Sequence, residues 1–123
     1  MTFTIPLIPI TKKNHQQIFR NGKTGKPFIT QSKQYKAYEA ACMLHIPRAA
    51  RQKIGVKVNL KGTFYMPTKR RVDLVNLLEA LQDILVLAGV LVDDNSEIVV
   101  STDGSRVLLD RENPRTEIEI TPV

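Results

Sequence analysis

Residues 70–89 read RRVDLVNLLEALQDILVLAG, and the rest of the chain is organised around this stretch. Its apolar residues recur at three- and four-residue spacing, which predicts the buried stripe of a helix: Leu74, Leu77, Leu78, Leu81, Ile84, Leu85 and Ala88. Asp73 is placed to cap the N-terminus of this helix, and Gly89 to follow its last turn as the C′ residue. The stretch therefore predicts a helix that packs on a core through one face.

A separate arc of the same helix is acidic, and the loop beyond it adds an adjacent pair of acids. These positions are Asp73, Asn76, Glu79 and Asp83, then Asp93 and Asp94. Carboxylate oxygens are the ligands that Mg²⁺ prefers. Asp73 and Asp83 are separated by roughly 15 Å of helix, too far to share one ion, so the loop pair must approach Asp73. Asp83 is expected to be a satellite acid or the partner of an arginine. A plain solvated loop is the alternative for the Asp pair.

The charge of the chain is divided between its two parts. Residues 1–72 hold fifteen Lys and Arg against one acid, a net charge of +14, and residues 73–123 hold three Arg against eleven acids, a net charge of −8. Such a division indicates a polyanion-binding part beside an acidic cluster, which a divalent cation would make compatible with phosphate. The alternative is that the two parts neutralise each other. The candidate nucleic-acid contacts are Lys12, Lys13, Asn14, Arg20, Lys69, Arg70 and Arg71.

The bulk properties indicate one small globular domain. A hydrophobic fraction of 42% over 123 residues is ordinary for a globular chain, and no apolar run approaches the roughly 20 residues of a membrane span. The N-terminus lacks the pattern of a signal peptide, and the single Cys42 excludes an internal disulfide. A cytoplasmic protein is therefore expected. We expect an α+β fold in which a mixed sheet packs against two main helices, within one domain over residues 1–123.

The remaining elements follow from alternation and turn signals. Strands are expected at 2–10, 54–66, 97–102, 106–109 and 116–121, with a bulge at Gly62 and a hairpin turn around residues 21–25 that leads to a returning strand at Phe28 and Ile29. Ser32 is expected to cap a helix that ends near Ile46, before Pro47. One face of this helix is expected in the core: Tyr35, Tyr38, Ala41 and Cys42, with His45 beside it as a structural or capping residue.

The central motifs resemble the RusA family of Holliday junction resolvases. The family pattern is a basic run, an Asp-hydrophobic-Asp-Asn-Leu motif, a Lys one turn later, a further Asp, a Gly and an Asp-Asp pair. The corresponding residues here are Arg70-Arg71, Asp73-Leu74-Val75-Asn76-Leu77, Asp83, Gly89 and Asp93-Asp94. Lys12-Lys13-Asn14, Arg20-Asn21-Gly22 and Ser32-Lys33-Gln34-Tyr35 also look like family features, so the resemblance covers most of the chain.

The resemblance implies a homodimer that binds branched DNA, such as a four-way junction, and cuts it with Mg²⁺, Mn²⁺ being the alternative metal. It implies metal ligands at Asp73 and Asp94, with Asp93 beside them, and a phage or prophage origin together with roles in recombination and repair. Under this reading, residues 1–123 are a single RusA-like nuclease domain. The catalytic residues expected from the resemblance and from the hypothesis below are Asp73, Asp94 and Glu79.

Two positions depart from the family pattern. Val75 stands where the second Asp is expected, and Glu79 stands where the Lys is expected. The two are neighbours at four-residue spacing, and helical side chains lean toward the N-terminus. Our hypothesis is that Glu79 reaches back one turn and replaces the missing carboxylate, with Lys13 or an arginine of 70–71 supplying the lost positive charge. The rival hypotheses are a branched-DNA-binding relative without cleavage, and a structural protein whose acidic helix docks on a basic surface.

Overall fold

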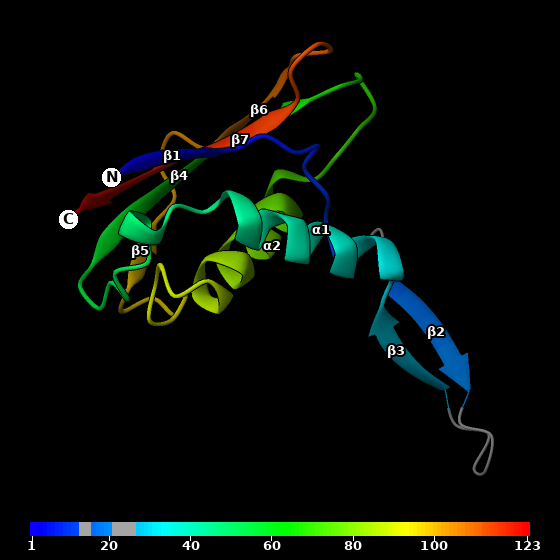
Figure 1. Ribbon diagram of the computed structural model, residues 1–123, viewed down its shortest axis with the longest axis horizontal. Helices are drawn as coiled ribbons and strands as arrows, with labels where there is room; N and C mark the ends of the chain where they lie inside the picture. The colour runs from blue at the N-terminus through cyan, green and yellow to red at the C-terminus, as the bar shows by residue number, and fades with distance from the viewer. Residues whose placement is uncertain (13–15, 21–26) are drawn as a thin grey trace.

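The computed structural model of this chain packs two helices on one side of a mixed sheet (Figure 1). It describes residues 1–12, 16–20 and 27–123, with the backbone alone for residues 16–20 and 27–31. The helices are α1 (Lys33–His45) and α2 (Leu74–Leu87), with a short 3-10 turn, η2 (Arg48–Ala50). Within the described residues, no helix is long and apolar enough to cross a bilayer.

The sheet is five-stranded and mixed in the described part of the chain. Its strands are β1 (Thr2–Ile5), β4 (Val58–Met66), β5 (Val99–Ser101), β6 (Arg106–Leu109) and β7 (Arg115–Pro122). β7 runs antiparallel to both β1 and β4, whereas β5 and β6 pair in parallel with successive parts of one edge of β4. The predicted α+β class, with a mixed sheet and two packed helices, is confirmed.

The α2 helix lies between β4 and β5 in the chain and covers one face of the sheet (Figure 1). Its buried side chains are Leu77, Leu78, Ala80, Leu81, Ile84 and Leu85. They meet the inward residues of β4 and β7, which are Leu60, Phe64, Ile118 and Ile120. The apolar stripe predicted from 3.6-residue periodicity is therefore the core-facing side of α2, and the acidic arc is left to solvent.

The α1 helix begins and ends where the capping signals predict. Ser32 is the N-cap residue, and its Oγ accepts a hydrogen bond of 3.1 Å from the Tyr35 amide. Ile46 turns extended, with φ −85° and ψ 117°, because the following Pro47 disfavours the helical region. Tyr35 and Cys42 are buried, as expected for the inner face.

The strand β2 (Gln16–Arg20) pairs antiparallel with β3 (Pro27–Gln31) as a separate two-stranded ribbon. Figure 1 shows this ribbon projecting from the body of the molecule at the start of α1. The predicted hairpin strands are confirmed, including Phe28 and Ile29 on the returning strand. The predicted turn around residues 21–25 lies outside the described residues.

Three sequence-based predictions about strands were wrong. The first strand ends at Ile5, because Pro6 and Pro9 withhold amide donors from the ladder. β4 starts at Val58 and not at residue 54, and Val56 is 62% exposed although the alternation placed it inside. Gly62 is not a bulge, since it pairs in regular register with Ile118.

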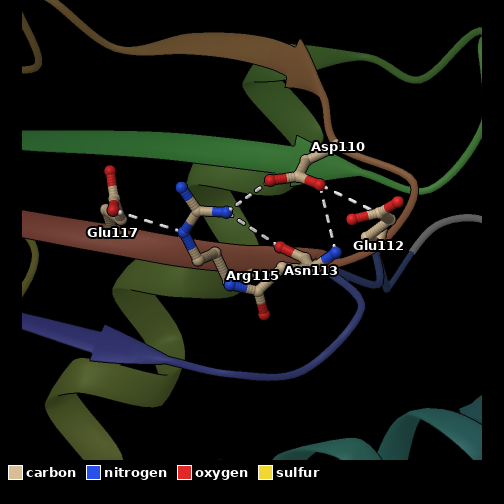
Figure 2. Close-up of polar contacts among 5 residues, drawn as sticks. All are labelled: Asp110, Glu112, Asn113, Arg115 and Glu117. Carbon is tan, nitrogen blue, oxygen red and sulfur yellow. Dashed lines mark hydrogen bonds and ion pairs between the residues drawn. The ribbon is translucent and has the colours of Figure 1, made fainter.

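Arg115, the first residue of β7, is the centre of a polar cluster at the connection from β6 to β7 (Figure 2). Arg115 Nη1 lies 2.9 Å from Asp110 Oδ2, and Nε lies 3.3 Å from Glu117 Oε2. The guanidinium also stacks on the ring of Tyr65, 3.7 Å from its centroid. Asp110 in turn accepts the backbone amides of Glu112 and Asn113 through Oδ1. The cluster is a structural clasp for the β6–β7 turn.

Candidate functional site

Asp73 sits at the N-terminus of α2 as the N-cap residue. Its backbone is extended, with φ −88° and ψ 118°, and its Oδ1 accepts a hydrogen bond of 3.0 Å from the Val75 amide. The first amides of a helix have no partner within the helix, and the short Asp73 side chain accepts a hydrogen bond from one of them. The predicted N-cap is confirmed, and the carboxylate is exposed at the predicted active face.

Val75 and Glu79 both point to solvent on the following turns of α2. Val75 is 68% exposed, an unusual place for a branched apolar side chain, and Glu79 is exposed as well. Neither side chain packs in the core, so core packing does not determine which residue occurs at either position. The hypothesis that Glu79 reaches back toward the position of Val75 stays a prediction.

Asp83 forms an ion pair with Lys12, from the segment that follows β1. Both side chains are partly withdrawn from solvent, with 22% of Lys12 and 34% of Asp83 exposed. The Lys12 ammonium also lies 6.0 Å from the ring centroid of Tyr35. Asp83 was expected to be a satellite acid or the partner of an arginine, and its observed partner is a lysine from a distant part of the chain.

Tyr35 is fully buried beneath this ion pair. Burial, followed by the negative charges of Glu39 and Asp83, raises its pKa, so its hydroxyl remains neutral. Glu79 contributes to the same shift of the Tyr35 pKa. The negative charges of Glu79 and Asp83 therefore both raise the pKa of Tyr35. The Lys12 ammonium is the cation beside the same ring.

The Asp93–Asp94 pair lies in the loop after α2, and its two carboxyls behave differently. Asp93 Oδ1 accepts the Asp94 amide at 2.7 Å, and this hydrogen bond is the main reason that the pKa of Asp93 is lowered. Asp94 is exposed, and its pKa is raised by the desolvation that remains, by the adjacent Asp93 side chain and by the charge of Asp83. The charge of Asp83 is thus one of the smaller contributions to the raised pKa of Asp94.

The predicted ligands are not arranged as a ready metal cage. In the described part of the chain, no group of three or more His, Cys, Asp or Glu side chains is placed to hold a metal ion. Asp73 caps the start of α2, whereas Asp93 and Asp94 lie in the loop that follows its C-terminal end. The joint binding of one ion by Asp73, Glu79 and Asp94 stays a prediction.

The residues predicted to contact DNA fall into three groups. Lys69, Arg70 and Arg71 are exposed on the connection between β4 and α2. Lys12 is engaged by Asp83, and Arg20 lies on β2, where the backbone alone is described. Lys13 and Asn14 lie outside the described residues. The exposed basic connection therefore leads directly into the acidic face of α2.

The contact between Lys12 and Asp83 is what sequence reasoning missed. The spacing had placed Asp83 and Glu79 four residues apart on one helical arc, which was the available signal for a shared role. Tyr35 was assigned to the core, which is correct, but its position under the ion pair depends on how α1 packs beside α2.

Exposed cations at residues 69–71 lie directly before the exposed acidic arc of α2, an arrangement that is compatible with binding of a polyanion. The chain matches the family model described as "Endodeoxyribonuclease RusA" over residues 6–121, and it belongs to this family. The match covers nearly the whole chain and confirms the resemblance drawn from the central motifs. The chain matches no curated protein.

Proposed function

We propose that this protein is a Mg²⁺-dependent endodeoxyribonuclease that cleaves Holliday junctions or related branched DNA in recombination and repair. The observation that carries the proposal is the RusA family match over residues 6–121. The exposed acids of α2 beside the basic connection at residues 69–71 support it, because phosphodiester hydrolysis needs both phosphate binding and stabilisation of developing charge.

The chemistry of the donor set fits a divalent cation. Mg²⁺ is typically held by one or two carboxylates and several waters, so a preformed cage of three acids is not required. Desolvation, followed by the neighbouring Asp93 side chain and the charge of Asp83, raises the pKa of Asp94. A bound cation would favour the ionised form of this carboxyl. The proposed ligands are Asp94 and Asp73, with Glu79 and Asp93 as further donors.

The residues of this chain have distinct parts in the proposed reaction. When bound, the metal would supply a polarised water and charge stabilisation at phosphorus. Lys69, Arg70 and Arg71 hold the phosphates that flank the cut. Asp73, fixed by its hydrogen bond to the Val75 amide, keeps its carboxylate at the end of α2 nearest those cations.

The lost carboxylate at Val75 is the weak point, and our proposal is that Glu79 makes up for it. Glu79 is exposed on the acidic arc, four residues after Val75, and shares a neighbourhood with Asp83. The alternative is a branched-DNA-binding relative whose metal site has degenerated. The exposed Val75 is the observation that favours this alternative, since a valine cannot bind a metal.

A junction-cleavage assay separates the two. Wild type, Glu79→Ala and the double variant Val75→Asp/Glu79→Lys are titrated with Mg²⁺ and Mn²⁺ on a synthetic four-way junction. The double variant carries the family residues at both positions and serves as the positive control. We expect cutting by wild type and loss of at least about a hundredfold in Glu79→Ala, the scale of removing one transition-state-stabilising group.

Each contrary result has one meaning. Cutting by the double variant alone shows that the natural site is degenerate. Equal cutting by wild type and Glu79→Ala shows that Glu79 is not a ligand. Binding that needs no metal and is unchanged in Asp73→Asn, with no cutting by any variant, indicates a non-catalytic binding protein. No binding at modest salt indicates a structural protein.

We further propose that residues 1–123 form one nuclease domain, that two copies form a homodimer, and that the protein acts in the cytoplasm. The family match supports the first two proposals, and the single buried Cys42 is compatible with a reducing compartment. A prophage or phage origin is part of the same proposal.

A further inference from the structure

A pocket of about 420 Å³ lies where the segment after β1 meets the connection between β4 and α2. Figure 1 shows this connection in green, with the blue N-terminal segment beside it. The pocket is lined by Pro9, Ile10, Thr11, Met66, Pro67, Thr68, Arg70, Arg71 and Val72. Its volume lies in the range of about 300–1,000 Å³ that is usual for small-molecule sites.

Two large apolar side chains of the lining lie outside the core. Ile10 and Met66 are half-buried, yet in the described part of the chain they do not join the core cluster. Pro67 is half-buried beside them. These side chains form an apolar wall that is partly exposed to water. A ligand that covered this wall would gain the free energy of burying its apolar surface.

The rim of the pocket is cationic. Arg70 and Arg71 are exposed, and neither forms an ion pair with a residue that the structure describes. The lining contains no acid. Guanidinium groups at the edge of an apolar wall suit a ligand that carries phosphate next to a flat, weakly polar body.

The pocket continues toward the predicted active face. A smaller pocket of about 290 Å³ is lined by Arg71, Val72, Asp73 and Asn76, so Arg71 and Val72 belong to both. Asp73 is thus the next lining residue after the two that the pockets share. The arrangement places a phosphate-binding rim between the apolar wall and the carboxylate.

We propose that this pocket binds one unstacked nucleotide of the DNA substrate, with its base against Ile10, Met66 and Pro67 and its phosphates on Arg70 and Arg71. The inference rests on the proposed function. It adds the site on the protein at which one nucleotide of the substrate is unstacked. A thioether packs favourably on an aromatic face, and every base offers such a face. Bases at a branch point are the easiest to unstack, because part of their stacking is already lost.

Fluorescence of 2-aminopurine tests this directly. The probe is placed in turn at each nucleotide next to the branch point of a four-way junction, and the protein is added in EDTA so that no strand is cut. We expect a several-fold rise of fluorescence at one position with wild type. Ile10→Ser/Met66→Ser is expected to lose the rise, while its affinity for the junction, measured by anisotropy with a separate dye, falls by less than about tenfold.

Two control variants separate loss of the apolar wall from general effects on the fold. Leu44→Ser changes an apolar side chain on α1 that is 85% exposed and outside the pocket, and it should keep the rise. Ile10→Val/Met66→Leu keeps the wall apolar and should also keep the rise, which distinguishes lost contact from lost fold.

The inference is overturned if bound wild type gives no rise at any position, since the arginines then contact the backbone alone. It is also overturned if Ile10→Ser/Met66→Ser retains the full rise. In both cases the junction is still bound, and the proposed function stands. A wild-type protein that binds no junction overturns the pocket and the proposed function together.

Discussion

Lys12, from the basic part of the chain, forms an ion pair with Asp83 of the acidic part. Its ammonium is shared between the Asp83 carboxylate and the ring of Tyr35, and both partners lie on helices. The ion pair balances the charge of one acid of the α2 face. Glu79 and Asp73 remain exposed on the same helix and at its N-cap.

The ion pair predicts a measurable coupling between Lys12 and Asp83. Lys12→Met and Asp83→Asn should each lower the free energy of unfolding by about 1 kcal/mol, because both groups are partly withdrawn from solvent. In urea denaturation the double variant should lose about 0.5–1 kcal/mol less than the sum of the two. Strictly additive losses would show that the pair contributes nothing. Lys57→Met, an exposed lysine, is the matched control.

At the scale of elements, β4 depends on the absence of a side chain at Gly62. A Cβ there would lie 3.0 Å from the Phe64 ring and 3.1 Å from the Leu81 side chain. The glycine thus lets α2 approach the sheet closely. This close approach explains why a glycine stands at a strand position that forms no bulge.

Gly62→Ala should lower the free energy of unfolding by about 1–3 kcal/mol, the scale of overpacking a core. Gly55→Ala is the matched control, since its Cβ would meet only Val92, at an ordinary 3.7 Å. Its free energy of unfolding should change by less than about 1 kcal/mol. Chemical denaturation of the two variants measures both. Equal stability of the two would contradict the close approach of α2 at Gly62.

The Arg115 clasp predicts an acid-sensitive part of the stability. The hydrogen bond from Arg115 is the largest reason that the pKa of Asp110 lies below its ordinary value of 3.8. A lowered folded pKa stabilises the protein above the ordinary value, and this contribution is lost as the pH falls through the folded pKa. Thermal midpoints of Asp110→Asn should therefore depend less on pH below about 4 than those of wild type. Parallel curves would contradict the prediction.

The helices were more predictable from sequence than the strands. The bounds of α2 follow from Asp73, Gly89 and the apolar stripe, all of which act within a few residues along the chain. The start of β4 was not predictable, because strand pairing depends on a distant partner: Val58 pairs with Pro122 on one side and Val99 on the other. Alternation alone could not show that Val56 lies beyond both ladders.

At the scale of the whole molecule, charge asymmetry predicts DNA binding with a steep salt dependence. Each phosphate contact releases a condensed counter-ion, so the logarithm of the binding constant falls linearly with the logarithm of salt concentration. Arg70→Ala and Arg71→Ala should each reduce that slope by about 0.9 on duplex DNA. Arg48→Ala, on η2, should leave it unchanged. Unchanged slopes in all three variants would exclude the basic connection from the DNA interface.

The proposed homodimer has its own test. One chain has a mass of 13.9 kDa, so light scattering coupled to size exclusion should report about twice that value at micromolar concentration. A mass equal to one chain, at concentrations where the junction is bound, would overturn the dimer and leave the nuclease proposal to stand by itself.

The sequence by itself determined the helix at residues 74–87, both of its caps, the acidic arc and the family. Periodicity, capping and motif spacing are local, and a chain carries them before it folds. The tertiary structure alone decided that Lys12 pairs with Asp83 over Tyr35, and that a pocket with an arginine rim opens beside Asp73. These features join distant segments, and only the packing of both helices on one sheet brings such segments together.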